Sequence, residues 1–146
     1  MLSDPHLEKA FQQATALHEP AFEQFFLVRL YGLRFSYAPG SCTVELMVRP
    51  WMHNPRGTLH GGVIAFGLDV SMGHLLNREI GPCATVETKT QFLRPVIDGE
   101  VRFTATFLKR GKSLQHLQST LTDASGALAA FATATWAAAP NSAPQG

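Results

Sequence analysis

The 146-residue sequence predicts an α+β fold in which one antiparallel, six-stranded sheet is wrapped around a single central buried helix. Residues 63–76 are apolar on nearly every side, so a helix there must be covered all round, and it is too short to span a bilayer. Two segments rich in β-branched and aromatic residues precede this helix, and four follow it. Short turns join most of these segments, which favours antiparallel neighbours.

The chain begins with a predicted amphipathic helix over residues 5–18. Asp4 and Pro5 suit the N-cap and the first helical position, and apolar residues then recur at helical spacing. Pro20 interrupts this pattern. The dense apolar run after it fits either a helix or a strand, and we favour a short helix that leads into the first strand. Residues 1–30 are therefore interpreted as an N-terminal helical extension.

The six strands are expected where segments of high β propensity lie between turns that contain Gly, Pro or Ser. Together with the central helix they define one domain over residues 31–138. The polar, Pro-rich residues 139–146 are expected to form a disordered tail. The predicted strand bounds are 33–37, 42–48, 84–92, 101–109, 114–122 and 128–136.

Charge and composition argue against several kinds of partner. With 12 Lys and Arg against 11 Asp and Glu, the net charge is +1, so the chain lacks the basic field typical of proteins that bind nucleic acids or anionic membranes. The N-terminus has no apolar run of the kind found in signal peptides, which predicts a cytoplasmic protein. Cys42 and Cys83 lack metal-site spacing, so we expect reduced thiols in the core and no metal site.

Asp69 is the anomaly of the predicted central helix, because it is the only charged residue between His60 and Arg78. A carboxylate among apolar neighbours must take up a proton or meet a polar partner. One hypothesis is structural, with Ser or Thr hydroxyls satisfying the carboxylate. The favoured hypothesis is functional, because a carboxylate in a dry cleft, with a shifted pKa, is suited to act as a general base or a nucleophile.

Gly61 and Gly62 begin the same helix, where backbone N–H groups lack intrahelical acceptors and the helix dipole favours negative charge. They are candidate donors to an oxyanion, the alternative being a tight turn. Asp69 follows Gly62 by 69 − 62 = 7 residues, or about 10 Å of helical rise. The two groups can meet at one atom only if they come from different chains. We therefore predict a homodimer, paired through sheet edges, with two equivalent sites.

The sequence resembles the acyl-CoA thioesterases of the hotdog fold, particularly the phenylacetate-degradation type within the 4-hydroxybenzoyl-CoA thioesterase-like superfamily. The resemblance rests on NPRGTLHGG at residues 54–62, on the helix through Asp69, and on QFLRPV at residues 91–96. It covers about residues 33–136. The combined pattern is specific, because an Asn, a His-Gly-Gly and a helical acid occur together at the spacings of the family.

This resemblance implies an enzyme that hydrolyses acyl-CoA thioesters to the free acid and CoA. The Gly61 N–H would polarise the thioester carbonyl, while Asn54 and His60 would shape the loop around it. Asp69 from the partner chain would activate water or attack the carbonyl directly, and Thr85 would hold the attacking water. No cofactor is implied, since coenzyme A is part of the substrate. Many members of this fold pair two dimers, so the resemblance also implies a homotetramer.

The substrate should contact cations through the phosphates of CoA and apolar side chains through its acyl group. Some relatives carry a Thr one helical turn after the acid, where this chain has Gly73. A mechanism that needs this hydroxyl would have to use Ser71 or Thr85. The predicted substrate-binding residues are Gly62, Phe66, Met72, Arg94, Arg110, Lys112 and Ser113, with Trp51 as a further apolar contact.

Two other functions stay open. An enoyl-CoA hydratase of the hotdog fold is one, because Asp69 and His74 match the spacing of the acid and the His in such enzymes. Five residues apart inside a helix, however, these side chains point about 140° apart. A non-catalytic acyl-CoA-binding module is the other alternative. No DNA-binding segment accompanies the domain, which disfavours a regulatory role.

Overall fold

The computed structural model describes residues 4–139 and confirms the α+β class with six strands around one long helix. The predicted tail lies outside the described residues, apart from residue 139. The elements in chain order are α1 (Pro5–Leu17), α2 (Phe26–Tyr31), β1 (Arg34–Ala38), β2 (Ser41–Met47), the short 3-10 helix η1 (Pro50–Met52), α3 (Gly61–Glu79), β3 (Cys83–Phe92), β4 (Glu100–Arg110), β5 (Leu114–Thr122) and β6 (Leu128–Ala138).

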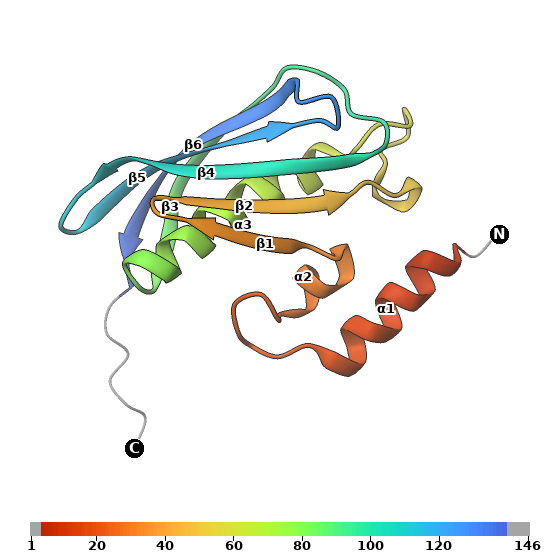
Figure 1. Cartoon of the computed structure of the whole chain (residues 1–146), viewed down its shortest axis with the longest axis horizontal. Coiled ribbons are helices and arrows are strands. Elements are labelled where there is room, and N and C mark those ends of the chain that lie inside the picture. The colour runs from red at the N-terminus through yellow and green to blue at the C-terminus, as the bar shows by residue number, and fades with distance from the viewer. Residues whose placement is uncertain (1–3, 140–146) are drawn as a thin grey trace.

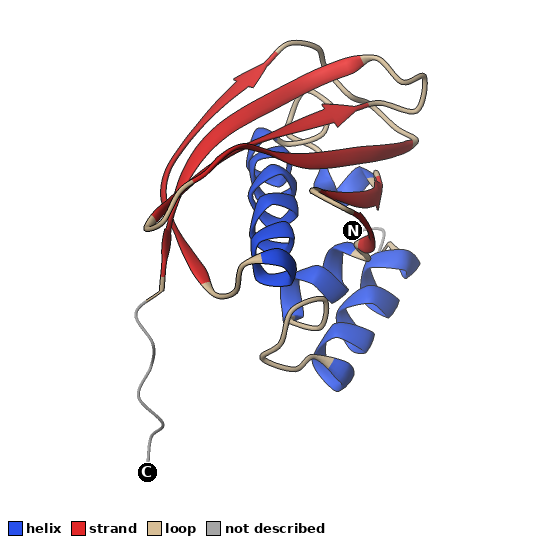
Figure 2. Cartoon of the chain, turned by 60° about the vertical axis from the view of Figure 1, so that its left-hand side comes forward, coloured by secondary structure: helices blue, strands red, loops and turns tan. Residues whose placement is uncertain are grey.

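The six strands form one antiparallel sheet in the order β1-β2-β4-β5-β6-β3. The sheet bends around α3, which lies along its concave face (Figures 1 and 2). The helices α1 and α2 lie outside the sheet, below β1 in the view of Figure 1. This order leaves β1 and β3 as the two edge strands, and β3 is the strand that begins directly after α3.

The observed strands agree with the predicted ones to within two residues at each end. The central helix is longer than predicted, since it begins at Gly61 and ends at Glu79. His60 caps its first turn, and Gly81, with a φ of +125°, turns the chain toward β3. Among the helices of residues 4–139, none combines the length and the apolar character that a membrane span needs.

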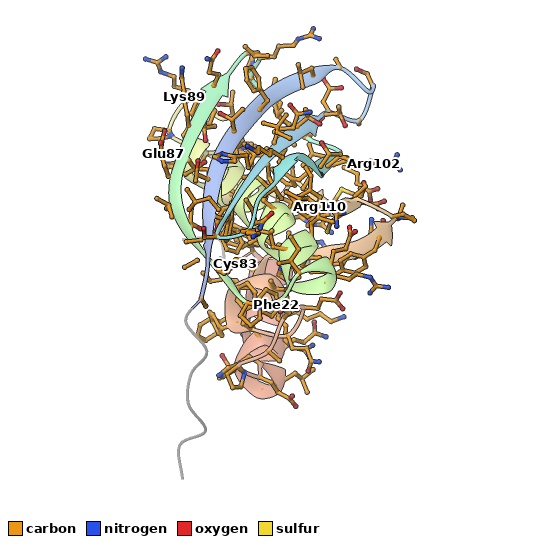
Figure 3. The ribbon with its side chains drawn as sticks, turned by 90° about the vertical axis from the view of Figure 1, so that its left-hand side faces the viewer. Phe22, Cys83, Glu87, Lys89, Arg102 and Arg110 are labelled. Atoms are coloured by element: carbon orange, nitrogen blue, oxygen red, sulfur yellow. The ribbon has the colours of Figure 1, made fainter. Side chains whose placement is uncertain are left out.

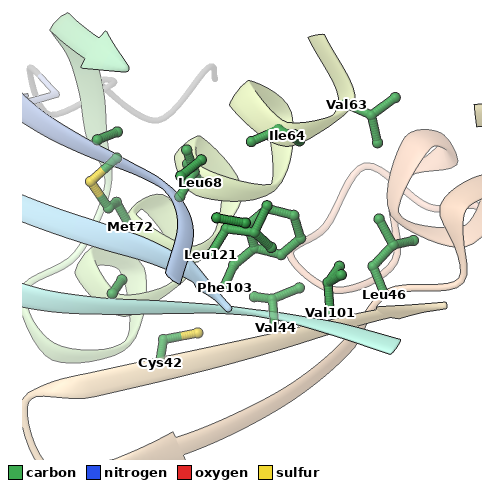
Figure 4. Packing of buried hydrophobic residues seen from close by; sticks show 14 of the residues in the cluster. Cys42, Val44, Leu46, Val63, Ile64, Leu68, Met72, Val101, Phe103 and Leu121 are labelled. Carbon is green, nitrogen blue, oxygen red and sulfur yellow. The ribbon is translucent and has the colours of Figure 1, made fainter. Parts of the chain in front are cut away.

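The core lies between α3 and the concave face of the sheet. Figure 4 shows Ile64, Leu68 and Met72 of α3 facing Phe103 of β4 and Leu121 of β5. All five side chains are buried, and each contributes about 1.5–3 kcal/mol to the free energy of unfolding by its removal from water. This face of α3 therefore fixes the helix against the sheet. The other faces of the helix are not covered by the sheet.

Gly67 sets the distance between α3 and β4. A Cβ atom placed on Gly67 would lie 2.3–2.5 Å from atoms of the buried Phe103 ring. We expect Gly67→Ala to lower the free energy of unfolding by about 1–3 kcal/mol, because overpacking outweighs the gain of about 1 kcal/mol in helix propensity. Urea denaturation measures this. Gly73→Ala is the comparison in the same helix, since its Cβ would lie 3.2 Å from the Trp136 ring, a tight contact but a much milder one than that at Gly67. A Gly67→Ala protein as stable as the Gly73→Ala protein would contradict this packing argument.

The prediction that α3 is covered all round holds only in part. Phe66, Asp69 and Gly73 form a half-buried stripe along the helix that its own chain leaves partly open. The neighbouring edge strand β3 is also open, and its residues are exposed along nearly the whole strand. The apolar helix and the edge strand thus leave a surface uncovered on the same side of the chain.

Candidate active site

Asp69 lies on the half-buried stripe of α3 and faces the start of β3. Its Oδ1 accepts a hydrogen bond of 3.1 Å from the Thr85 hydroxyl. Burial raises the pKa of Asp69 above its ordinary value, and the bond from Thr85 partly opposes that rise. The carboxylate is therefore partly removed from water and has only one hydrogen bond from a side chain of its own chain. This environment is suited to a general base or a nucleophile.

A groove of about 270 Å³ opens beside the Asp69 carboxylate. Its lining is mostly aromatic and aliphatic, and it contains no Lys or Arg among the residues that the structure describes. Figure 3 shows two of the lining residues, Phe22 and Cys83, at the end of the molecule where β3 begins. The lining residues are Phe22, Phe25, Asp69, Val70, Gly73, His74, Cys83, Ala84, Thr85 and Trp136.

Phe22 and Phe25 line the groove, although their positions in the sequence did not predict them as site residues. Both come from the connection between α1 and α2, which the expected domain boundary assigned to an N-terminal extension. The available signal was the cluster of aromatic residues just after Pro20, which has no helical or strand period.

Cys83 was expected in the core, and this was wrong, because it is only half-buried and lines the groove. Cys42 is buried as expected.

His74 is buried, and both of its ring nitrogens are engaged. Nδ1–H donates to the Val70 carbonyl at 2.9 Å, and Nε2 accepts from the Glu23 N–H at 3.0 Å. Burial lowers the pKa of His74, which favours this neutral form. The ring also stacks on Phe35, with centroids 4.2 Å apart. Since no ring nitrogen is left for a substrate, the structure argues against an Asp69–His74 pair of the hydratase kind.

Two other predicted residues on α3 do not face the groove. Met72 is 0% exposed within the core, so its predicted contact with the substrate is wrong; the all-apolar helix gave no sign of which face meets the sheet. Ser71 is also buried, and its hydroxyl donates to the Leu68 carbonyl and bonds to Ser119 at 2.7 Å. Thr85 is therefore the hydroxyl that reaches Asp69. Phe66 packs against the ring of Phe25, 6.5 Å between centroids.

At the other end of α3, His60 separates the roles of the two glycines. The His60 Nδ1 accepts the Gly62 N–H at 2.8 Å, so that donor is occupied. The Gly61 N–H, at the first helical position, has no acceptor among residues 4–139. The histidine thus acts as a cap that orients the helix terminus, and Gly61 is the donor left for an oxyanion.

Asn54 organises the loop that leads to Gly61. Its Oδ1 accepts from the Arg56 N–H at 2.9 Å, and its Nδ2 donates to the Thr58 hydroxyl at 2.9 Å. Asn54 and Arg94 also line a shallow groove of about 320 Å³ in front of Gly61. Asn54 thus lies in the loop before α3, as predicted, and Arg94 lies near the Gly61 end of α3.

The remaining predicted contacts lie on the hairpin between β4 and β5. Arg110 forms a 2.6 Å ion pair with Glu79 and stacks over Phe107, whereas Lys112 and Ser113 are exposed. Strand register places this hairpin at the same end of the sheet as Thr85, since Gln115 pairs with Trp136 and Trp136 pairs with Thr85. Contact between these residues and CoA stays a prediction.

One chain does not bring its own acid and free donor together. Asp69 follows Gly61 by 69 − 61 = 8 residues of unbroken helix, or about 12 Å of rise. The exposed edge strand β3 carries Val86 and Phe92, which are 62% and 56% exposed. Apolar exposure of this kind on an unpaired edge is typical of a surface that pairs with another chain.

Known proteins resemble this chain in sequence and in fold. A family model described as the thioesterase superfamily matches residues 56–130. Human acyl-coenzyme A thioesterase 13 is 38% identical over 91 residues, which cover 60% of this chain and 65% of that protein, just under two thirds of its length. Residues 56–130 contain the end of the loop before α3, α3 itself, β3, β4, β5 and the start of β6.

Solved structures share the fold. A conserved protein from Pseudomonas aeruginosa is 29% identical, with a TM-score of 0.71 over 76% of this chain and 91% of that one. The PaaI protein of E. coli, from the phenylacetic acid degradation operon, has a TM-score of 0.78 at 20% identity, over 92% of this chain and 96% of that one. The likeness identifies the sheet wrapped around α3 as the hotdog fold.

Proposed function

Because this chain belongs to the thioesterase superfamily and is a thioester hydrolase, we propose that it hydrolyses acyl-CoA thioesters to the free acid and CoA at a site shared by two subunits. One observation carries the proposal. A half-buried carboxylate of raised pKa faces an apolar groove, while the helix that carries it begins with an N–H that has no acceptor within residues 4–139. The acid and the donor are the two groups that acyl transfer to water requires.

In the proposed reaction, Gly61 of one subunit donates its N–H to the thioester oxygen as negative charge develops there. Asp69 of the other subunit takes a proton from water while the water oxygen attacks the carbonyl carbon, or it attacks that carbon itself and water then opens the anhydride. The carbon–sulfur bond breaks, and the CoA thiolate leaves and takes up a proton. Thr85 orients the carboxylate through its hydrogen bond. Water is the only co-reactant in this scheme.

The homodimer is part of the proposal. Its support is the distance between Asp69 and Gly61 along one helix, together with the exposed edge strand β3 and the half-buried stripe on α3. Two copies with antiparallel α3 helices would cover both surfaces and would bring each acid to the other's glycine. Pairing of two dimers into a tetramer and a cytoplasmic location stay predictions from the sequence.

We further propose that the two subunits divide the contacts to CoA. Arg94 lies at the glycine end of its chain, and Lys112 and Ser113 lie at the Asp69 end. A shared site therefore meets cations from both subunits, which suits a substrate with phosphates at two places. Arg110 is paired with Glu79 and would have to exchange that partner to contact a phosphate.

A complementation experiment tests the shared site. Asp69→Asn and Gly61→Pro each disable one half of it, so each variant alone should release little CoA from aryl-, short- or long-chain acyl-CoAs that the wild type cleaves. When the two variants are co-expressed with separate tags, random pairing makes about half of the dimers mixed, and each mixed dimer has one intact site. We expect about a quarter of the wild-type rate, measured with a thiol reagent.

The outcomes separate two failures. If the co-expressed variants show only the average of their separate rates, the site lies within one chain and the shared geometry is wrong. If the wild type releases no thiol from any acyl-CoA of the panel, the acyl-CoA substrate is wrong. Hydration of an enoyl-CoA without thiol release would favour the hydratase alternative, and tight binding without reaction would favour the binding module.

A further inference from the structure

We propose that the turn between α1 and α2 forms the end wall of the acyl pocket, and that Phe22 and Phe25 set the length of acyl group that the enzyme accepts. The inference rests on the proposed function, because it assigns the groove beside Asp69 to the acyl part of an acyl-CoA. It adds residues from a segment that lies outside the matched family region of residues 56–130.

The chemistry of the groove selects the acyl part of the substrate. Its lining is mainly aromatic and aliphatic side chains, and its one formally charged group is the Asp69 carboxylate. The phosphates of CoA would be repelled by this carboxylate and would find no cation among the lining residues that the structure describes. An alkyl or aryl group placed there would instead remove apolar surface from water.

The two phenylalanines are placed to contact such a group. Phe22 lines the groove and is 44% exposed, and its ring forms a T-shaped contact with the His74 ring, with 4.9 Å between centroids. Phe25, in the same segment, is half-buried, and its ring lies at a right angle to the ring of Phe66. Removal of either ring would lengthen the groove without touching Asp69 or Thr85.

The turn is held in place by contacts with the body of the domain. The Glu23 N–H donates to His74 of α3, and the Tyr37 hydroxyl of β1 donates to the Glu23 carboxylate. Within the turn, the Glu19 N–H donates to the Gln24 carbonyl at 2.9 Å. Glu23 adopts a φ of +66°, the only positive φ of a non-glycine residue within residues 4–139. The wall is therefore a fixed part of the groove.

The test compares Phe22→Ala and Phe25→Ala with Leu27→Ala over a series of straight-chain acyl-CoAs. Leu27 is a matched control, since it is 43% exposed in the same region and does not line the groove. We expect the ratio of kcat/KM for long over short chains to rise at least about tenfold in both Phe variants and to stay unchanged in the control. Phe22→Trp should move the ratio in the opposite direction.

Binding of non-hydrolysable S-alkyl-CoA thioethers, measured by calorimetry, gives a second readout that needs no turnover. The same shift toward longer chains in the affinities of the Phe variants supports the end wall even if the wild type hydrolyses none of the thioesters, an outcome that overturns only the proposed function. Unchanged long-to-short ratios in both readouts overturn the end wall, as does an equal shift in Leu27→Ala.

Discussion

Asp69→Asn is expected to lower kcat by about 10²- to 10⁴-fold, the usual contribution of a positioned proton acceptor. The change removes the charge and the basicity of the side chain and keeps its shape. The Asn Oδ1 can still accept the hydrogen bond from Thr85, so the local geometry is retained. Steady-state release of CoA measures the effect. Asp98→Asn, at an exposed acid in the loop before β4, is the control and should keep the wild-type rate.

The stability of Asp69→Asn separates a catalytic loss from unfolding. Because burial raises the pKa of Asp69, the folded protein binds this proton more tightly than the unfolded chain does. Ionisation therefore costs folding free energy, and this cost grows as pH rises from the ordinary Asp pKa through the raised one. The Asn variant should melt at or above the wild-type temperature at neutral pH. Near-wild-type turnover in this variant would reject Asp69 as the general base or nucleophile.

The same raised pKa fixes the direction of the pH dependence. In the wild type, kcat/KM should fall as pH drops through the pKa of Asp69, because a protonated carboxyl cannot accept a proton or attack a carbonyl. The fall should occur above the pH at which an ordinary Asp is protonated. Residual activity of the Asn variant should lack this acid limb.

The fold could be predicted because its elements have strong local signals. Six strands between turns and one long apolar helix leave few arrangements other than a sheet wrapped around that helix. Asp69 could be predicted as a site residue for a similar reason, because it is a single charge in an apolar helix. Both signals are local in sequence, and the structure confirms the central helix and places Asp69 on its partly open side.

The face of the helix could not be predicted in the same way. An all-apolar helix has no period that tells the side toward the sheet from the side toward a groove, so Met72 was assigned to the substrate although it is buried in the core. The partners of His74 were equally hidden, because one of them is Glu23, 51 residues away. Phe22 and Phe25 enter the groove through that same long-range contact.

The two glycines of His-Gly-Gly also look equivalent in sequence, and only the cap distinguishes them. The His60 Nδ1 accepts the hydrogen bond of the Gly62 N–H, and a Cβ on Gly62 would lie 3.0 Å from the same nitrogen. A side chain at Gly62 would therefore disturb the cap itself. A Cβ on Gly61 would meet only the Phe92 ring, at 3.4 Å, so Gly61 tolerates substitution and allows its N–H to be tested alone.

Gly61→Pro is expected to lower kcat by about 10²- to 10³-fold, as loss of one oxyanion donor does. Pro suits the first position of a helix, where its missing N–H breaks no intrahelical bond. His60 before it already has extended angles, φ −62° and ψ 134°, that the residue before a Pro prefers. Gly61→Ala adds the same Cβ and keeps the N–H, so it should stay within a few fold of the wild type. Equal losses in both variants would mean that crowding of Phe92, and not the donor, causes the effect.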